Sequence, residues 1–196
     1  MRKTISGIIF FATFGLTNFA LAEQVPPQQI TSFETPGNLV STNALKCVGA
    51  ESLENKFTPA DLYSAVPICA KQGKYNEGFF LFALAGTYGR FDTLRVSDKS
   101  AHQAVSILLM QAFGDMTPDE RDGFQKVLNK TIENPDSLAS TCQLIERIGP
   151  PTYYPRYMIQ HGMAAFTSNG TDDGLVKNFD ASAAWKLSLD SYLHCH

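Results

Sequence analysis

Apolar residues recur at intervals of three and four over most of this chain, the spacing of helices that bury one face. The clearest example is the stretch from Phe57 to Val96. Its first residues are typical of a helix start, because Thr58 can cap the first turn, Pro59 suits the first helical position and Asp61 interacts favourably with the helix dipole. We therefore predict a helical hairpin here, with its turn at Gly73.

The second helix of this hairpin is expected to start near Tyr75. Small and large residues alternate on one of its faces, which lets another helix approach closely: Phe79, Phe82, Ala83 and Gly86. The polar residues 87–99 are interpreted as a connection. Pro67 conflicts with a regular first helix, since it lacks the N–H that a helix interior uses, and we expect it to kink the helix or shift its start.

The rest of the chain shows the same helical spacing. Further helices are predicted around 101–112, from Thr117, and at 137–148, 153–166 and 181–193, and a short one is compatible with 45–55. No segment has sustained strand alternation, so we predict an all-α fold, a compact bundle of antiparallel helix pairs with six or seven helices. The stretch from Gly73 to Gly86 resembles a tetratricopeptide or Sel1-like hairpin, although no second copy follows in register.

Residues 1–22 follow the pattern of a secretory signal peptide. Arg2 and Lys3 precede an apolar run, and Ala20-Leu21-Ala22 is a small-x-small cleavage site. The alternative, an uncleaved membrane anchor, is disfavoured because the run is shorter than the ~20 residues of a spanning helix. Residues 23–43 are rich in Pro, Gln, Ser and Thr and are interpreted as a flexible leader. The expected single helical domain is 44–196, in the periplasm or secreted.

Four cysteines lie in the exported part of the chain: Cys47, Cys69, Cys142 and Cys195. An even number in an oxidising compartment favours two disulfides. Three pairings are open, and we favour Cys47 with Cys69 and Cys142 with Cys195, because each would tie neighbouring elements together. The competing interpretation is a zinc site, which the absence of short paired spacings disfavours.

Charge and motifs narrow the function classes. The net charge is −3 and becomes more negative once Arg2 and Lys3 are removed, which disfavours nucleic acid as a partner. The mature chain has no expected membrane anchor. The chain contains no Gly-x-Ser-x-Gly, Ser-x-x-Lys or His-Glu-x-x-His motif, so no catalytic residue, metal or cofactor is assigned.

A polar cluster within 90–102 is the first candidate site. It consists of Arg90, Asp92, Arg95, Asp98 and His102. Two arginines, two aspartates and a histidine can form an anion site or a general acid–base pair. The alternative is structural: the aspartates pair with the arginines and cap the following helix.

A tyrosine-rich loop is the second candidate, and it is the one that we assign to protein binding. Tyr153, Tyr154, Arg156 and Tyr157 have the composition that protein interfaces favour. In the alternative, the rings close one end of the core while Arg156 stays solvated. A third candidate is the 194–196 tail, where two histidines flank Cys195 and could bind copper or zinc.

Together these features predict a periplasmic, non-enzymatic protein that binds another protein. A small, acidic, disulfide-bonded helical protein resembles in type the periplasmic immunity proteins that inhibit antibacterial toxins, which implies a toxin domain as partner. One alternative is an envelope hydrolase or metal-dependent enzyme that uses His102 and His161 with Asp92 or Asp98. Another is a structural subunit of an envelope assembly, in which the 79–86 face meets a partner helix.

Overall fold

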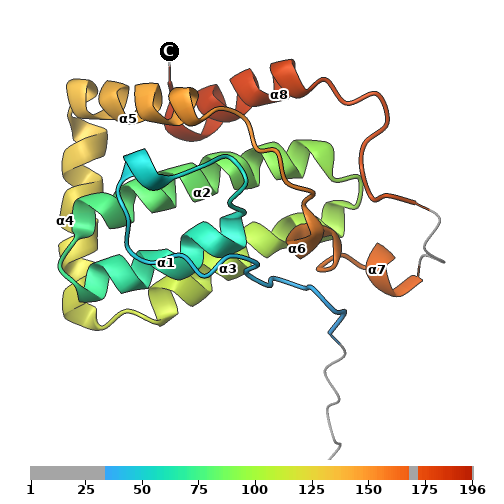
Figure 1. Cartoon of the computed structure of the whole chain (residues 1–196), viewed down its shortest axis with the longest axis horizontal. Helices are drawn as coiled ribbons and strands as arrows, with labels where there is room; N and C mark the ends of the chain where they lie inside the picture. Colours follow the sequence, from blue (N-terminus) through green and yellow to red (C-terminus); the bar gives the residue numbers. More distant parts are fainter. Residues whose placement is uncertain (1–33, 168–171, 196) are drawn as a thin grey trace, which may run out of the picture. The chain divides into compact units, whose positions relative to one another are not determined.

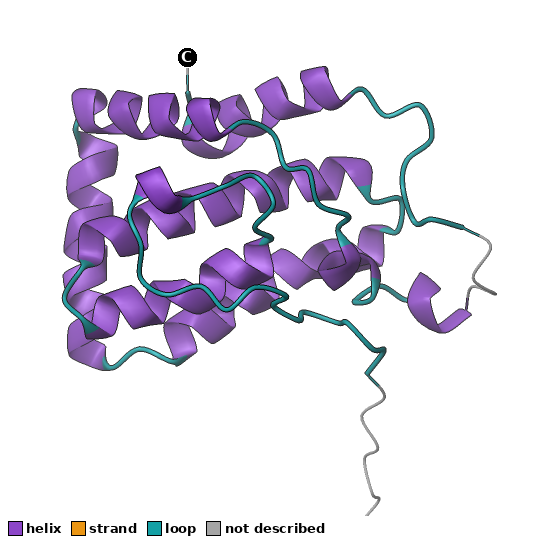
Figure 2. Cartoon of the chain, viewed as in Figure 1, coloured by secondary structure: helices purple, strands orange, loops and turns teal. Residues whose placement is uncertain are grey.

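The computed structural model describes residues 34–167 and 172–195, which form eight α-helices and three short helical turns without a β-strand (Figures 1 and 2). The all-α fold is therefore confirmed. The elements are η1 (Ala50–Ser52), α1 (Pro59–Lys71), α2 (Tyr75–Arg95), η2 (Lys99–Gln103), α3 (Ala104–Gly114), α4 (Pro118–Glu133), α5 (Pro135–Ile148), α6 (Arg156–Ile159), α7 (Ala164–Thr167), α8 (Ala181–Ser188) and the π-helical turn η3 (Leu189–Leu193). None of the described helices is both long and apolar enough to cross a membrane.

The hairpin of α1 and α2 is the centre of the bundle, as predicted. Thr58 accepts a hydrogen bond from the Asp61 N–H and the Asp61 carboxylate accepts one from the Thr58 N–H, so α1 begins with a complete capping box. Gly73 takes a left-handed backbone conformation, with φ +68°, between the helices. Pro67 lies inside α1 and does not shift its start. The predicted helix around 45–55 is reduced to the single turn η1.

α2 is longer than expected, because it continues to Arg95 through residues that were interpreted as a connection. Its glycines explain the error. An added Cβ at Gly86 would overlap the Tyr192 ring, and one at Gly89 would lie 2.8 Å from a methyl group of Val105. These glycines therefore let neighbouring elements approach α2, and they do not end the helix.

An aromatic cluster joins α2 to α3 and α4. The rings of Phe82, Phe113 and Phe124 pack edge to face, with centroids 5.3 to 6.1 Å apart. α4 runs across one end of the α1–α2 hairpin in Figure 1, so this cluster closes that end. The 79–86 face of α2 is accordingly packed mainly against other helices of the bundle, with Phe79 only 5% exposed.

The predicted helix over 153–166 is wrong in its continuity, because it is divided into α6 and α7. Gly162 lies between them, against the side chains of Asp98 and Ala101. The Asp98 carboxylate accepts a hydrogen bond of 2.8 Å from the Ala164 N–H, which fixes the start of α7. The predicted last helix begins as expected and is completed by α8 and η3.

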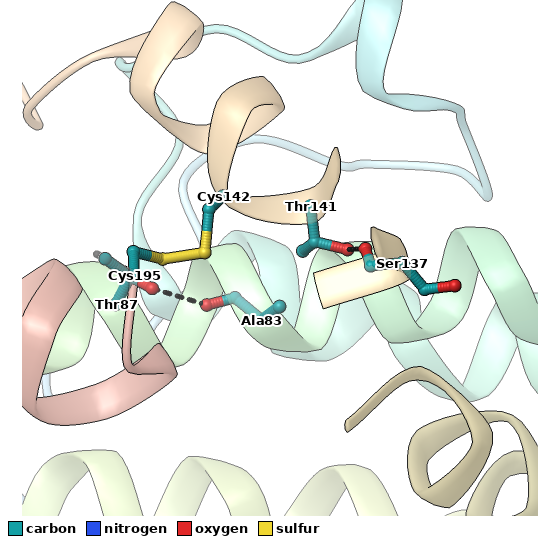
Figure 3. The surroundings of a disulfide bond; sticks show 6 residues. All are labelled: Ala83, Thr87, Ser137, Thr141, Cys142 and Cys195. Atoms are coloured by element: carbon teal, nitrogen blue, oxygen red, sulfur yellow. Dashed lines mark hydrogen bonds between the residues drawn. A yellow bond between two sulfur atoms is a disulfide. The ribbon is translucent and has the colours of Figure 1, made fainter. Parts of the chain in front are cut away.

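Both predicted disulfides are confirmed. Cys47 is bonded to Cys69 of α1, and Cys142 of α5 is bonded to Cys195. Figure 3 shows the second bond beside α2, close to Thr87. All four thiols are therefore used in disulfides, and none is left as a zinc ligand.

The helical unit includes residues before 44, its expected start. The Leu39 N–H donates to the Tyr157 carbonyl oxygen at 3.1 Å, and the Thr42 and Asn43 N–H groups donate to the Asp61 carboxylate. Residues 34–43 are thus attached to the bundle, where a flexible leader was expected. The predicted signal peptide and residues 23–33 lie outside the described residues.

Candidate functional site

The two sequence-predicted sites meet at Asp92. This residue lies in the last turn of α2 with no exposed surface. One of its oxygens, Oδ2, accepts hydrogen bonds from the hydroxyls of Tyr153 at 2.9 Å and Tyr157 at 2.8 Å. The polar segment near 90 and the tyrosine loop near 155 are therefore parts of one cluster, which we call the Asp92 cluster: Asp92, Arg95, Tyr153 and Tyr157.

Arg95 supplies the positive charge of this cluster. It lies three residues after Asp92 and therefore on the same face of α2. Its Nε donates to Asp92 Oδ1 at 2.7 Å, and its Nη2 is 2.7 Å from the same oxygen. Its guanidinium lies between the rings of Phe91 and Tyr153, 5.2 and 5.0 Å from their centroids, where cation–π attraction adds to the ion pair.

Burial sets the protonation of the cluster. Desolvation raises the pKa of Asp92, and Arg95 and the two phenols offset only part of that increase. Burial, followed by the nearby Asp92 charge, raises the pKa of Tyr153 and Tyr157 well above the usual value. The tyrosines therefore stay protonated and donate. Since protein donors occupy both carboxylate oxygens, Asp92 acts as an anchor for residues 153–157 and is not an accessible general base.

The other members of the predicted polar cluster do not join this centre. Arg90 Nε donates to the hydroxyl of Ser191, in η3, at 3.1 Å. Asp98 caps η2 by accepting from the Ser100 N–H, and His102 Nε2 lies 3.0 Å from the Val96 carbonyl oxygen. The structural alternative, in which aspartates pair with arginine and cap the next helix, describes Asp92 and Asp98 correctly.

His161 does not share a partner with His102. Its Nδ1 is 2.9 Å from Asn38 Oδ1, in the segment that precedes α1. Of the residues proposed for an enzyme, only Asp98 and His102 interact with each other, through their charges, and no hydrogen-bond partner is shared among His102, His161, Asp92 and Asp98. Among residues 34–167 and 172–195, no three His, Cys, Asp or Glu side chains are grouped to hold a metal ion. Within the 194–196 tail, Cys195 is disulfide-bonded and His196 lies outside the described residues.

Comparisons with protein-family models, curated proteins and solved structures find no match. The functional inference therefore depends on the residues of this chain.

The tyrosine loop is divided between core and surface. Tyr157 is 2% exposed and Tyr153 is bound to Asp92, so these two predicted contact residues point into the bundle. Tyr154 is 50% exposed, and its hydroxyl donates to the Asp173 carbonyl oxygen at 2.6 Å. Arg156 is also exposed. The loop thus presents only half of the surface that its composition indicated.

Three further exposed residues were not recognised from the sequence. Met163 is 63% exposed, Phe166 51% and Val176 40%. They lie on segments that are hydrogen-bonded to the end of α2 and to η2, which follows it: the Val176 N–H donates to the Arg95 carbonyl oxygen at 2.8 Å, and the Met163 N–H to the Ser100 hydroxyl at 2.8 Å. Met163 lies at the division between α6 and α7 and Phe166 in α7, and helical spacing alone did not indicate this division.

A second buried carboxylate, Asp61, was recognised only as a helix-start residue. Its Oδ1 accepts from the Ser41 hydroxyl and from the N–H groups of Thr42 and Asn43, at 2.7 to 2.8 Å. Its Oδ2 accepts from the Asn43 amide at 3.0 Å and the Thr58 N–H at 2.8 Å. Burial alone would raise the pKa of Asp61, but these hydrogen bonds bring it below the usual value. Asp61 therefore fixes the start of the helical unit.

Proposed function

We propose that this chain is an extracytoplasmic, non-enzymatic protein that binds another protein with the surface around α6 and α7. The observation that carries the proposal is a group of exposed side chains of the type that interfaces favour: Tyr154, Arg156, Met163, Phe166 and Val176. Aromatic residues, methionine and arginine are enriched in the centres of protein interfaces.

Hydrogen bonds hold the residues next to this surface in place, which favours binding. Tyr153 and Tyr157, which flank Tyr154 and Arg156, are held by the Asp92 carboxylate. Asp98 holds the first N–H of α7. A surface whose flanking residues are already fixed loses little conformational entropy on binding, so its contacts contribute more fully to affinity.

Two disulfides support an oxidising compartment, where such bonds form and persist. For the partner we propose a secreted antibacterial toxin domain, on the resemblance in type to periplasmic immunity proteins. The exposed surface would cover such a domain from outside, without any catalytic step by this chain.

The test compares two pairs of exposed apolar residues. Tyr154→Ala with Phe166→Ala removes two large side chains from the proposed surface. Met110→Ala with Ile132→Ala removes two of similar exposure, 59% and 55%, from α3 and α4. Both double variants are exported and purified, and their affinity for a toxin domain encoded beside this gene is measured by calorimetry.

We expect the first pair to weaken binding at least about tenfold, since central interface residues typically contribute more than 1 kcal/mol each. The control pair should change affinity less than about twofold, because isolated exposed residues contribute little. Equal affinity of the two double variants would remove the α6–α7 surface from the proposal. Absence of any binding by the unaltered protein would reject the toxin domain as partner.

A further inference from the structure

A groove runs between α5 and residues 49–55, the segment that contains η1 and leads to α1. Two hollows of about 520 and 420 Å³ form it, and they are adjacent, because both are lined by Ala50 and Leu144. In Figure 1, η1 lies next to α2 and below α5. The groove is therefore on different elements from the surface around α6 and α7.

The lining of this groove combines an apolar base with polar sides, because hydroxyl and amide side chains also line it: Asn55, Asn76, Thr131, Ser137, Ser140 and Thr141. Leu53, Phe79 and Phe80 lie at its base and are 5 to 7% exposed, while Leu144 and Ile148 form half-buried parts of the α5 wall. Hollows of this volume fall within the range of ligand-binding clefts in proteins, about 300 to 1,000 Å³. Each hollow therefore has room for large apolar side chains.

Both walls of the groove are fixed without a ligand. The Cys47–Cys69 disulfide ties the chain just before residues 49–55 to α1. At the end of this segment, the Asn55 carbonyl oxygen accepts from the Thr152 N–H at 3.0 Å. On the opposite wall, α5 is capped by the Asn134 side chain. A preformed groove avoids the entropic cost of ordering on binding.

The rim of the groove is mainly negative. Glu51, Glu54 and Glu77 line it, against Arg147. Glu54 is paired with Lys56 at 2.7 Å, whereas Glu51 and Glu77 form no ion pair within the described part of the chain. Glu51 belongs to one hollow and Glu77 to the other. A ligand that crosses both hollows would therefore meet an unneutralised carboxylate at each.

We propose that this groove docks a basic amphipathic segment of a partner protein. Its large apolar side chains fill the two hollows, and its Lys or Arg side chains lie against Glu51 and Glu77. An apolar base with charged residues at its edge is the arrangement by which grooves bind amphipathic helices. The charge of the rim selects a basic segment over an acidic one, because like charges across an interface are repulsive. This proposal does not depend on the α6–α7 surface.

The probe is a synthetic helical peptide of about 18 residues, with leucines at intervals of three and four and lysines elsewhere. Its counterpart carries glutamate in place of every lysine. Both are labelled with fluorescein, and their binding to the purified, oxidised protein is followed by fluorescence anisotropy at low and high salt. We expect the lysine peptide to bind and the glutamate peptide not to bind.

Substitutions in the groove test whether the peptide binds there. Glu51→Gln with Glu77→Gln should weaken the lysine peptide about tenfold at low salt and much less at high salt, since salt screens exposed charges. The control, Glu133→Gln with Glu146→Gln, removes the same charge from exposed positions outside the groove and should change affinity less than twofold. Ala50→Trp, which places a ring where the two hollows meet, should abolish binding.

Several results would overturn the proposal. They are the absence of binding by the unaltered protein, equal affinity for the glutamate peptide, and equal losses in the two glutamine pairs, which would show non-specific attraction. Should Ala50→Trp fail to fold, the glutamine pairs still decide, because Glu51, Glu133 and Glu146 are exposed, Glu77 is only half-buried, and glutamine keeps the size of each side chain. Tyr154→Ala with Phe166→Ala should leave peptide affinity unchanged, so failure here and failure of the α6–α7 interface are separate outcomes.

Discussion

Asp61 and Asp92 are both buried without exposed surface, and each holds a segment from elsewhere in the chain, but they use different partners. Asp61 accepts five hydrogen bonds, all from neutral groups, and three come from backbone N–H groups. Asp92 is held by an arginine and two phenols, all of them side chains. Changing a side chain does not remove a backbone N–H group, so Asp61 cannot be replaced together with all its hydrogen-bond donors. Every donor to Asp92 is a side chain, so this carboxylate and its donors can be replaced together.

A disulfide also constrains each of the segments that these carboxylates bind. Asp61 binds residues 41–43, and Cys47, which follows them closely in the chain, is bonded to Cys69. Residues 153–157, bound by Asp92, lie inside the loop that Cys142–Cys195 closes. Both attached segments therefore have one electrostatic and one covalent constraint.

The largest effect is expected from Asp61→Leu. It leaves the N–H groups of Thr42, Asn43 and Thr58 without the Asp61 acceptor. An unsatisfied buried donor costs about 1–3 kcal/mol, which applies most fully to Thr58, since Thr42 is exposed and Asn43 half-buried. Because five hydrogen bonds to the carboxylate are also lost, we expect a loss of about 4–5 kcal/mol in the free energy of unfolding, measured by urea denaturation. A loss below about 1 kcal/mol would show that water replaces the carboxylate there.

The matched experiment at Asp92 replaces the whole cluster: Asp92→Leu, Arg95→Met, Tyr153→Phe and Tyr157→Phe. Replacing a buried ion pair by apolar residues of similar volume is often neutral or stabilising, so we expect a change within about 1 kcal/mol. Asp92→Leu alone leaves a buried arginine unpaired and should cost about 3–5 kcal/mol. Equal losses in the single and quadruple variants would contradict the distinction from Asp61.

The disulfides come next in size. Alanine at both Cys142 and Cys195 opens a loop of 53 residues and should cost about 4 kcal/mol, against about 3 kcal/mol for Cys47 and Cys69, whose separation is 22. Amide hydrogen exchange in 153–157 should rise only when Cys142 and Cys195 are replaced. Mass spectrometry of the oxidised, proteolysed protein checks the pairing, and a peptide joining Cys47 to Cys142 would contradict it.

A smaller effect is expected from single hydroxyl deletions. Tyr157→Phe removes one donor to a buried carboxylate and should cost about 1.5–3 kcal/mol, since hydrogen bonds to charged groups contribute in that range. Tyr154→Phe, which loses a hydrogen bond at an exposed position, should cost less than about 1 kcal/mol. Thermal unfolding of the two variants distinguishes them, and equal shifts would contradict the division of the loop into core and surface.

The smallest effect is a difference in pH dependence between the two aspartates. The lowered pKa of Asp61 gives stability that is present above the unfolded-state pKa, about 3.9, and is lost as pH falls through the folded-state pKa. The raised pKa of Asp92 acts in the opposite sense, because the folded state gains stability as pH falls through its own pKa towards 3.9.

Urea denaturation between about pH 3 and 7 measures this for the unaltered protein, Asp61→Asn and Asp92→Asn. As pH falls, the deficit of Asp61→Asn should shrink, because the unaltered protein loses the Asp61 contribution. The deficit of Asp92→Asn should grow, because the unaltered protein gains stability from protonation of Asp92. Parallel profiles for the two variants would contradict the opposite pKa shifts.

Local signals in the sequence were sufficient for much of the fold. Thr58-Pro59 and Thr117-Pro118 identified the starts of α1 and α4, because capping acts within one turn. Prediction failed where distant residues decide the outcome. The polar residues 87–99, which include Gly89, were interpreted as a connection, yet the missing side chain of Gly89 makes room for Val105 of α3.

The candidate site was predicted in its parts but not in its arrangement. The sequence identified Asp92 and the tyrosine loop separately, and the hydrogen bonds that join them span 61 and 65 residues. Spacing in the sequence indicates which face of a helix a residue occupies, but not which distant segment covers that face. For the same reason Tyr153 and Tyr157 were expected on the surface, and the binding of Asp61 to residues 41–43 was not foreseen.

The length of chain between each carboxylate and its partners also has a kinetic consequence. The contacts from 41–43 to Asp61 span 18 to 20 residues, about a third of the separation at Asp92, and shorter loops close more readily. We therefore expect the capped start of α1 to form early in folding and the tyrosines to dock late. Loss of the Asp61 contacts should slow folding, whereas loss of a tyrosine hydroxyl should chiefly accelerate unfolding. The tyrosine contacts should accordingly affect the unfolding rate, and with it the lifetime of the folded protein, more than the folding rate.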